Sequence, residues 1–182
     1  AVPVINFSSD DGTGFGVRAS LYEYDGESVP YRRKYSAQAF ATTGGKWVHR
    51  LLLDTPQIRP GERLEAELVY EKEEFANYYG GLSDEKVAGY TRDQRTFRQA
   101  FPELKAKWIR ALRAPWRLRL GGRVSHNSIE TNASSGSILS ELGPLGAAGG
   151  VFVQLNGALR YDTRDNYNDA SAGYLQEIML DV

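Results

Sequence analysis

Alternation of apolar and polar residues with a period of two constrains this chain more than any other feature. In the segment 116–125, WRLRLGGRVS, the apolar side chains occupy even positions and the arginines occupy odd positions. A helix, with 3.6 residues per turn, would spread those arginines around its circumference, whereas a strand places them on one side. The segment is therefore predicted to be a β-strand with one apolar face and one charged face.

The same alternation recurs at 15–21, 63–71 and 151–162, and weaker versions occur elsewhere. Turn-forming pairs such as Gly44-Gly45 and Pro60-Gly61 separate the alternating segments. A β-bulge or a change of face is expected near Trp108. The predicted fold class is all-β, one antiparallel domain over residues 1–182 with eight or nine strands. The nine candidate strands are 2–9, 14–25, 32–43, 46–55, 62–76, 95–113, 116–128, 150–162 and 173–182.

The connections and the aromatic residues favour a transmembrane β-barrel. The two long connections, about 77–94 and 129–149, both follow odd-numbered strands, and outer-membrane barrels carry their longer loops on the extracellular side. No apolar run reaches the 18 residues of a helical span, and the mean hydropathy of −0.46 suits strands with one polar face. Aromatic residues are expected in two girdles at the strand ends. One group is Tyr22, Tyr24, Tyr31, Tyr35, Trp116, Tyr161 and Tyr174, and the other is Phe15, Trp47, Tyr70 and Phe97.

In a barrel the charged side of each strand faces the interior, or lumen. Seven residues are predicted to face it: Arg18, Glu65, Glu67, Arg117, Arg119, Arg123 and Arg160. Their mixed signs leave two alternatives open, a lumen filled by salt bridges and a conducting pore. Because a membrane sheet must close and bacterial barrels have even strand numbers, about nine strands predict additional strands or a partner chain at the free edges.

Composition argues against several other functions. The chain has 22 Lys and Arg against 23 Asp and Glu, so no basic excess indicates a nucleic-acid partner. It has no Cys and only two histidines, His49 and His126, far apart in sequence, so no metal site and no cofactor is predicted. The spacing of His126 and Ser128 leaves a lipid hydrolase as a minor alternative to a non-enzymatic protein, with Glu130 or Asn132 as the orienting group.

One local string resembles a known family. Tyr161, Asp162, Thr163, Arg164, Asp165 and Asn166, followed by Gly173, are similar to a strand-to-turn string in the bacterial surface antigen superfamily of outer-membrane barrels, the BamA/TamA-like proteins. The resemblance implies the first half of a sixteen-stranded barrel in the bacterial outer membrane, in contact with lipid and lipopolysaccharide. It also implies a role in outer-membrane protein assembly or transport. A structural or pore-forming subunit of an envelope complex is the alternative, and the string itself also fits a well-satisfied polar turn.

Overall fold

The computed structural model describes residues 1–9, 11–166 and 169–182 of the 182-residue chain. Nine β-strands carry the fold: β1 (Val2–Ser8), β2 (Gly12–Glu23), β3 (Arg33–Thr42), β4 (Lys46–Arg59), β5 (Glu62–Asn77), β6 (Thr96–Ala111), β7 (Trp116–Thr131), β8 (Gly150–Asp162) and β9 (Leu175–Asp181). All nine candidate strands are confirmed, with ends that differ by up to four residues. The chain is therefore all-β, as its alternation predicts.

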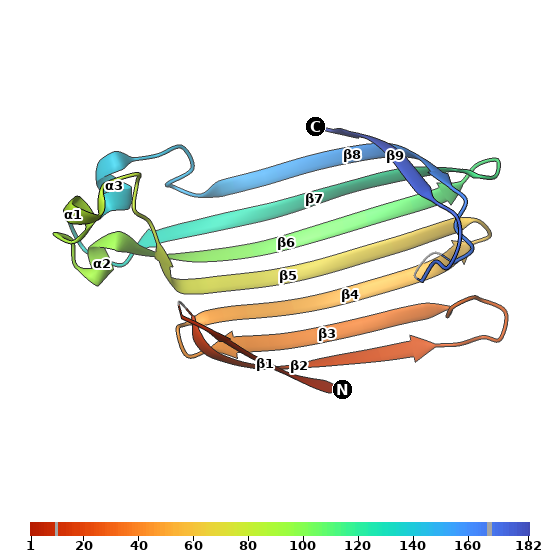
Figure 1. Cartoon of the computed structure of the whole chain (residues 1–182), viewed down its shortest axis with the longest axis horizontal. Coiled ribbons are helices and arrows are strands. Elements are labelled where there is room, and N and C mark those ends of the chain that lie inside the picture. Colours follow the sequence, from red (N-terminus) through yellow and green to blue (C-terminus); the bar gives the residue numbers. More distant parts are fainter. Residues whose placement is uncertain (10, 167–168) are drawn as a thin grey trace.

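The strands form a single antiparallel sheet in which sequence order and spatial order are the same, β1 to β9. Each strand pairs with the next along the chain, so the whole sheet is a meander. The sheet does not close: within the described part of the chain, β1 and β9 each pair on one side only and form its two free edges. Figure 1 shows the N-terminus and C-terminus at these two edges.

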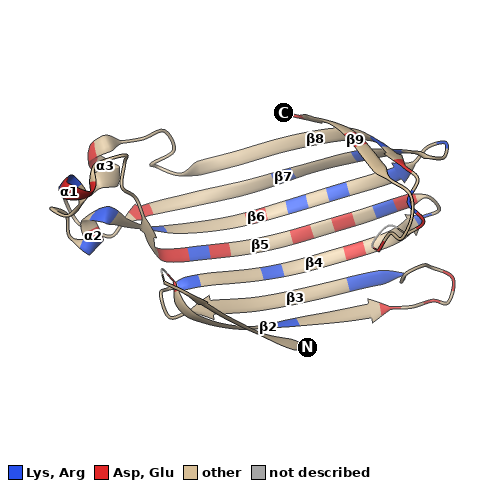
Figure 2. Cartoon of the chain, viewed as in Figure 1, with Lys and Arg blue, Asp and Glu red and all other residues tan. Residues whose placement is uncertain are grey.

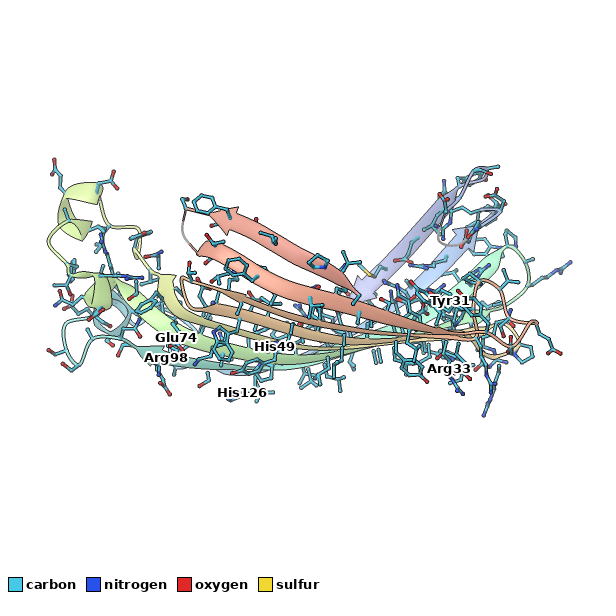
Figure 3. The ribbon with its side chains drawn as sticks, turned by 90° about the horizontal axis from the view of Figure 1, so that it is seen from below. Tyr31, Arg33, His49, Glu74, Arg98 and His126 are labelled. Carbon is cyan, nitrogen blue, oxygen red and sulfur yellow. The ribbon has the colours of Figure 1, made fainter. Side chains whose placement is uncertain are left out.

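The sheet is curved like a trough. Seen edge-on in Figure 3, β1 and β2 rise at one side and β8 and β9 at the other, and both rise toward the same side of the sheet. We call the inner side the concave face and the outer side the convex face. The labelled side chains of His49 and His126 lie on the convex face.

The strand register assigns the remaining side chains to a face, because residues directly opposite each other on neighbouring strands point the same way. His49 lies opposite Tyr70, and Tyr70 lies opposite Pro102. Leu104 lies opposite Val124, so Pro102, two residues before Leu104, is level with His126, two residues after Val124. Within each strand, every second residue from these positions lies on the convex face, and the residues between them lie on the concave face.

Three short helices occupy the long connections. Helices α1 (Asp84–Val87) and α2 (Arg92–Arg95) lie between β5 and β6, and α3 (Ile138–Leu142) lies between β7 and β8. They gather at one end of the sheet, which we call the loop end (Figure 1). Tyr90 Oη donates a hydrogen bond of 2.9 Å to Glu141 Oε2 and so ties the two connections together. None of the described helices is long enough or apolar enough to cross a membrane.

The expected bulge near Trp108 is wrong. The register of β6 with both neighbours runs without interruption through this residue. The irregularities of the sheet lie elsewhere, between Thr55 and Arg59 of β4 and between Glu73 and Ala76 of β5. The sequence misleads here because Ile109, an apolar residue, lies on the concave face. It is only 2% exposed and stands opposite two arginines, Arg63 and Arg119.

The chain exposes much more surface than a folded domain of its size. Its accessible surface is 11,764 Å², whereas a compact monomer of 20.3 kDa is expected to expose about 8,800 Å². A single curved sheet has no second layer over either face, which accounts for the excess of about 3,000 Å². What each face carries is therefore the main guide to function.

Candidate functional site

The convex face is an uninterrupted apolar surface, which we call the convex belt. It includes Phe15, Val17, Leu21, Leu51, Leu68, Leu104, Leu120, Val124, Val153, Leu155, Leu159, Ile178 and Leu180. All of these side chains are more than two-fifths exposed, and Ile178 is 81% exposed. A soluble monomer rarely exposes an apolar patch of more than a few hundred Å², so a surface of this extent indicates contact with another apolar phase or partner.

The belt has a measurable height. On β5, the charged residues nearest to it on the convex face are Glu62 and Lys72, ten positions apart, and every convex residue between them is uncharged. Ten residues of strand span about 33 Å. With the strand tilt of about 40° typical of membrane barrels, this corresponds to a band about 25 Å tall. The uncharged band therefore has the height of the lipid-facing band of outer-membrane barrels.

Aromatic groups border the belt at both ends. At the loop end the ring of His49 packs between Trp47 and Tyr70, with centroid distances of 6.2 Å to each. At the opposite end Trp116 packs edge-on against Tyr161 at 5.1 Å. Three of the aromatic residues expected at the borders lie instead on the concave side: Tyr22 and Phe97 by their register, and Tyr31 through its hydrogen bond to Asp54. The expected girdles are thus present on the convex face but include fewer residues.

The concave face is charged, and Figure 2 shows charged residues following one another along the middle of β5 and β6. One row of ion pairs crosses four strands. Arg50 lies 3.8 Å from Glu67, Lys105 lies 3.9 Å from Glu67 and 2.7 Å from Glu103, and Arg123 lies 3.4 Å from Glu103. The side chain of Glu103 is only 6% exposed, and Lys105 and Arg123 supply the opposite charges that a buried carboxylate requires. This row links β4, β5, β6 and β7.

A second row lies nearer the end opposite the helices. Tyr31 Oη donates to Asp54 Oδ2 at 2.6 Å, and Arg63 binds Asp54 at 2.8 Å and Glu65 at 2.9 Å. Lys107 completes the row at 2.5 Å from Glu65. Burial and the Asp54 carboxylate raise the pKa of Tyr31, so this phenol stays protonated and remains a donor. The row connects the segment before β3 with β4, β5 and β6.

A third cluster holds β9 on the sheet. Glu177 of β9 is paired with Arg160 of β8 and lies 3.0 Å from Arg119 of β7. Because β9 has a neighbour on one side only, this cluster is its main polar attachment on the concave face besides the backbone ladder. The edge strand is therefore tied across two strands.

All seven residues predicted to face a lumen share the concave face. Glu67 lies opposite Lys105, which lies opposite Arg123, and Arg117 lies opposite Arg160. Arg18 belongs to the same face through Gln38 and Arg50. The structure brings Glu65, Glu67, Arg119, Arg123 and Arg160 into the ion-pair clusters, while Arg117 lies 3.7 Å from Asp162. Arg18 stands apart from these clusters and donates to the side-chain amide oxygen of Gln38.

Sequence reasoning missed several members of the clusters: Asp54, Glu103, Lys105, Lys107 and Glu177. Those on β6 share odd positions, so simple alternation would have found them. The bulge expected near Trp108 hid them, because it broke the alternation of β6 into two halves. Glu177 was missed since the last strand shows little alternation of its own.

The string 161–166 forms a well-satisfied polar turn. Asp162 accepts hydrogen bonds from the backbone N–H and the guanidinium of Arg164, and Asp165 accepts from the backbone N–H groups of Ser171 and Ala172. The Ser171 hydroxyl donates to Asp165 at 2.5 Å, and this bond is the main reason that the pKa of Asp165 falls to about 2.

Two other members of the string close the turn. Thr163 exchanges hydrogen bonds with Tyr174, and Gly173 has φ +90°, with the backbone oxygen of Thr163 where a Cβ would lie. The residues of the string therefore join β8 to β9. Residues 167 and 168 lie outside the described part of the chain.

The residues proposed to orient His126 for catalysis, Glu130 and Asn132, have other partners. His126 and Ser128 share the convex face of β7. The side chain of Asn132 donates to Glu74 O and Thr96 Oγ1, and Glu130 lies 3.4 Å from Arg98. Both candidate orienting groups are thus engaged elsewhere. Among the described residues, no group of three or more His, Asp or Glu side chains is placed to hold a metal ion.

Comparison with known proteins adds no relative: no family model and no curated protein matches the chain.

Proposed function

We propose that this chain is part of a bacterial outer-membrane β-barrel of the BamA/TamA-like superfamily, acting in the assembly or transport of outer-membrane proteins. In this proposal the convex belt contacts lipid and the concave face lines the lumen. Helices α1 to α3 then lie on the extracellular side, next to lipopolysaccharide. The superfamily rests on the string from Tyr161 to Asn166 together with Gly173.

The observation that carries the membrane assignment is the uncharged band of the convex belt. Its height of about 25 Å agrees with the apolar band of outer-membrane barrels, while the opposite face of the same strands is charged and paired. A soluble sheet would bury its apolar face under a second layer. Here the described chain supplies no such layer, and lipid would cover this face.

The free edges support a larger barrel. Each unpaired peptide group in hydrocarbon costs several kcal/mol, so both edges need partners. β1 and β9 are the first and ninth strands of a meander and run in the same direction. An antiparallel closure therefore needs an odd number of further strands between them, in agreement with sixteen in total. These strands would come from the same polypeptide or from a partner chain.

The alternative of a structural barrel subunit is favoured by one observation. The ion-pair rows leave every charged group of β6 on the concave face with an opposite charge within 4 Å. This central part of the wall, neutralised in this way, supplies little net field for selecting ions. A structural role in an envelope complex therefore fits the concave face better than an ion-selective pore does.

Cysteine labelling tests the membrane assignment, since the chain has no cysteine of its own. We expect Leu68→Cys and Leu104→Cys, on the convex belt, to react slowly with a membrane-impermeant maleimide after folding into lipid vesicles. Ser36→Cys, on the concave face, is the matched position and should react rapidly. Equal, rapid reaction at all three positions would overturn the membrane assignment.

A second experiment separates assembly from a structural role. Depletion of the protein in its own cell should lower the amounts of other outer-membrane β-barrels if it assembles them. Their amounts should stay constant, with only the envelope complex affected, if its role is structural.

A further inference from the structure

The concave face is divided into two regions by the pairing of its cations. On β5 to β8, each concave Lys or Arg has a carboxylate within 4 Å. On β2 and β3, Arg18 and Lys34 have none among the residues that the structure describes. Arg18 donates through Nε and Nη2 to Gln38 Oε1 at 2.8 and 2.5 Å, and Lys34 Nζ lies 5.6 Å from the ring of Tyr22.

These two cations line one hollow of about 400 Å³ with a third, Arg50. We call it the basic hollow. Its only acidic residue is Glu67, which lies 3.8 Å from Arg50 and 3.9 Å from Lys105. The remaining polar lining consists of neutral donors: Ser20, Tyr22, Ser36 and Gln38. Three cations and one carboxylate give the lining a formal net charge of 3 − 1 = +2.

The composition of the basic hollow fits an oxygen-rich anion. Arginine and lysine donate short, charge-assisted hydrogen bonds to phosphate oxygens, and hydroxyl groups complete such sites. A monocarboxylate would neutralise only half of the excess charge. A phosphate monoester, which carries about −1.5 to −2 at pH 7, would neutralise nearly all of it. The volume lies within the range of about 300–1,000 Å³ found for small-molecule sites.

We propose that the basic hollow on β2, β3 and β4 binds a soluble phosphate-bearing ligand, held by Arg18, Lys34 and Arg50. The hollow opens on the concave face, so a phosphate that arrives in solution reaches it, whereas a lipid headgroup beside the convex belt does not. This inference goes beyond the proposed function and does not depend on it, because it rests on the pairing of cations within one face.

Titration of the folded, detergent-solubilised protein with inorganic phosphate and with glycerol phosphate, followed by calorimetry at low salt, tests the proposal. Saturable binding is expected for both, and acetate should bind much more weakly. Arg18→Gln and Lys34→Gln should each weaken phosphate binding by about tenfold, since each removes a charge-assisted hydrogen bond. Arg18→Lys, which keeps the charge but not the planar guanidinium, should lose less.

Arg117→Gln is the matched control on the same face. Asp162 keeps its contact of 2.9 Å with Arg164 in this variant, and Arg117 lies outside the basic hollow, so phosphate binding should not change. The proposal is overturned if phosphate does not bind saturably, if Arg117→Gln weakens binding as much as Arg18→Gln, or if only vesicles of anionic phospholipid bind. The far-ultraviolet circular dichroism of each variant establishes that its sheet is intact.

Discussion

The two faces of this sheet are built from the same strands and oppose each other in every physical respect. The convex belt exposes large apolar side chains, such as Leu68 at 47%, with no charged residue across its middle. The concave face holds carboxylates that are almost fully covered, such as Glu103 at 6%, and pairs them across strands. The apolar side chains are exposed and the carboxylates are covered, whereas a soluble sheet buries its apolar side chains and exposes its charged ones. The difference agrees with the proposal that lipid covers the convex face and that the concave face lines a polar lumen.

The largest expected effect comes from placing a charge on the convex belt. Leu68→Arg should destabilise the membrane-folded protein by about 2–4 kcal/mol, the cost of an arginine near the middle of a bilayer. The side chain of Leu68 lies between Leu51 and Leu104 in the register, far from either border of the belt. Urea unfolding from lipid vesicles measures the change.

The matched control places the same substitution on the other face. Leu52 is on the concave face, opposite Ser36 and Glu67, so Leu52→Arg gains an acidic neighbour and should cost less than about 1 kcal/mol. If the two substitutions destabilise the protein equally, the two faces see the same medium and the contrast between them fails.

The contrast between the faces could be predicted from sequence where the alternation is strict. In 116–125 each arginine falls on the concave face and each leucine on the convex face, as period two requires. The prediction failed where one residue broke the alternation. Ile109 suggested a bulge in β6, yet the backbone is regular, and an isolated apolar residue is simply covered between two arginines.

Phe40 is a second residue that sequence alternation could not explain. It lies on the concave face of β3, among polar residues, and its ring occupies the space that a side chain at Gly14 would need: a Cβ there would lie 2.2 Å from Phe40 Cζ. An aromatic ring that covers a glycine on a neighbouring strand is a known way to stabilise a curved sheet. Which glycine a ring covers depends on register, so a single sequence cannot reveal it.

The ion pairs between strands were the part of the site that the sequence predicted least well. Alternation gives the face of Glu103 but not its neighbours, since those depend on how β6 is aligned with β7. The basic hollow could not be predicted from the sequence for the same reason. It consists of one cation from each of three strands, and only the register shows that Arg18 and Arg50 lie in one row on either side of Gln38.

A smaller effect is expected from removing one charge of the concave face. Glu103→Gln leaves Lys105 and Arg123 without their shared carboxylate and should cost about 1–2 kcal/mol. The value stays below that of a fully buried pair because both cations are about two-fifths exposed to water. Glu130→Gln is the control: Glu130 is 67% exposed and lies 3.4 Å from Arg98, so its loss should cost less than about 0.5 kcal/mol. Equal costs in urea unfolding would show that burial on the concave face adds nothing.

The smallest effect tests the turn that joins β8 to β9, where the charged face ends. Hydrogen bonds from Ser171 and Ala172 lower the pKa of Asp165 to about 2 from an ordinary value of 3.8. A carboxyl whose pKa is lower in the folded state contributes stability that is fully present above its unfolded pKa and is lost as pH falls through the folded pKa. The urea midpoint of the protein should therefore exceed that of Asp165→Asn at pH 5, and the difference should shrink between pH 4 and pH 2. A difference that stays constant over this range would mean that the ionised Asp165 does not hold the turn, and that the hydrogen bonds of the Thr163 backbone and hydroxyl with Tyr174 close it by themselves.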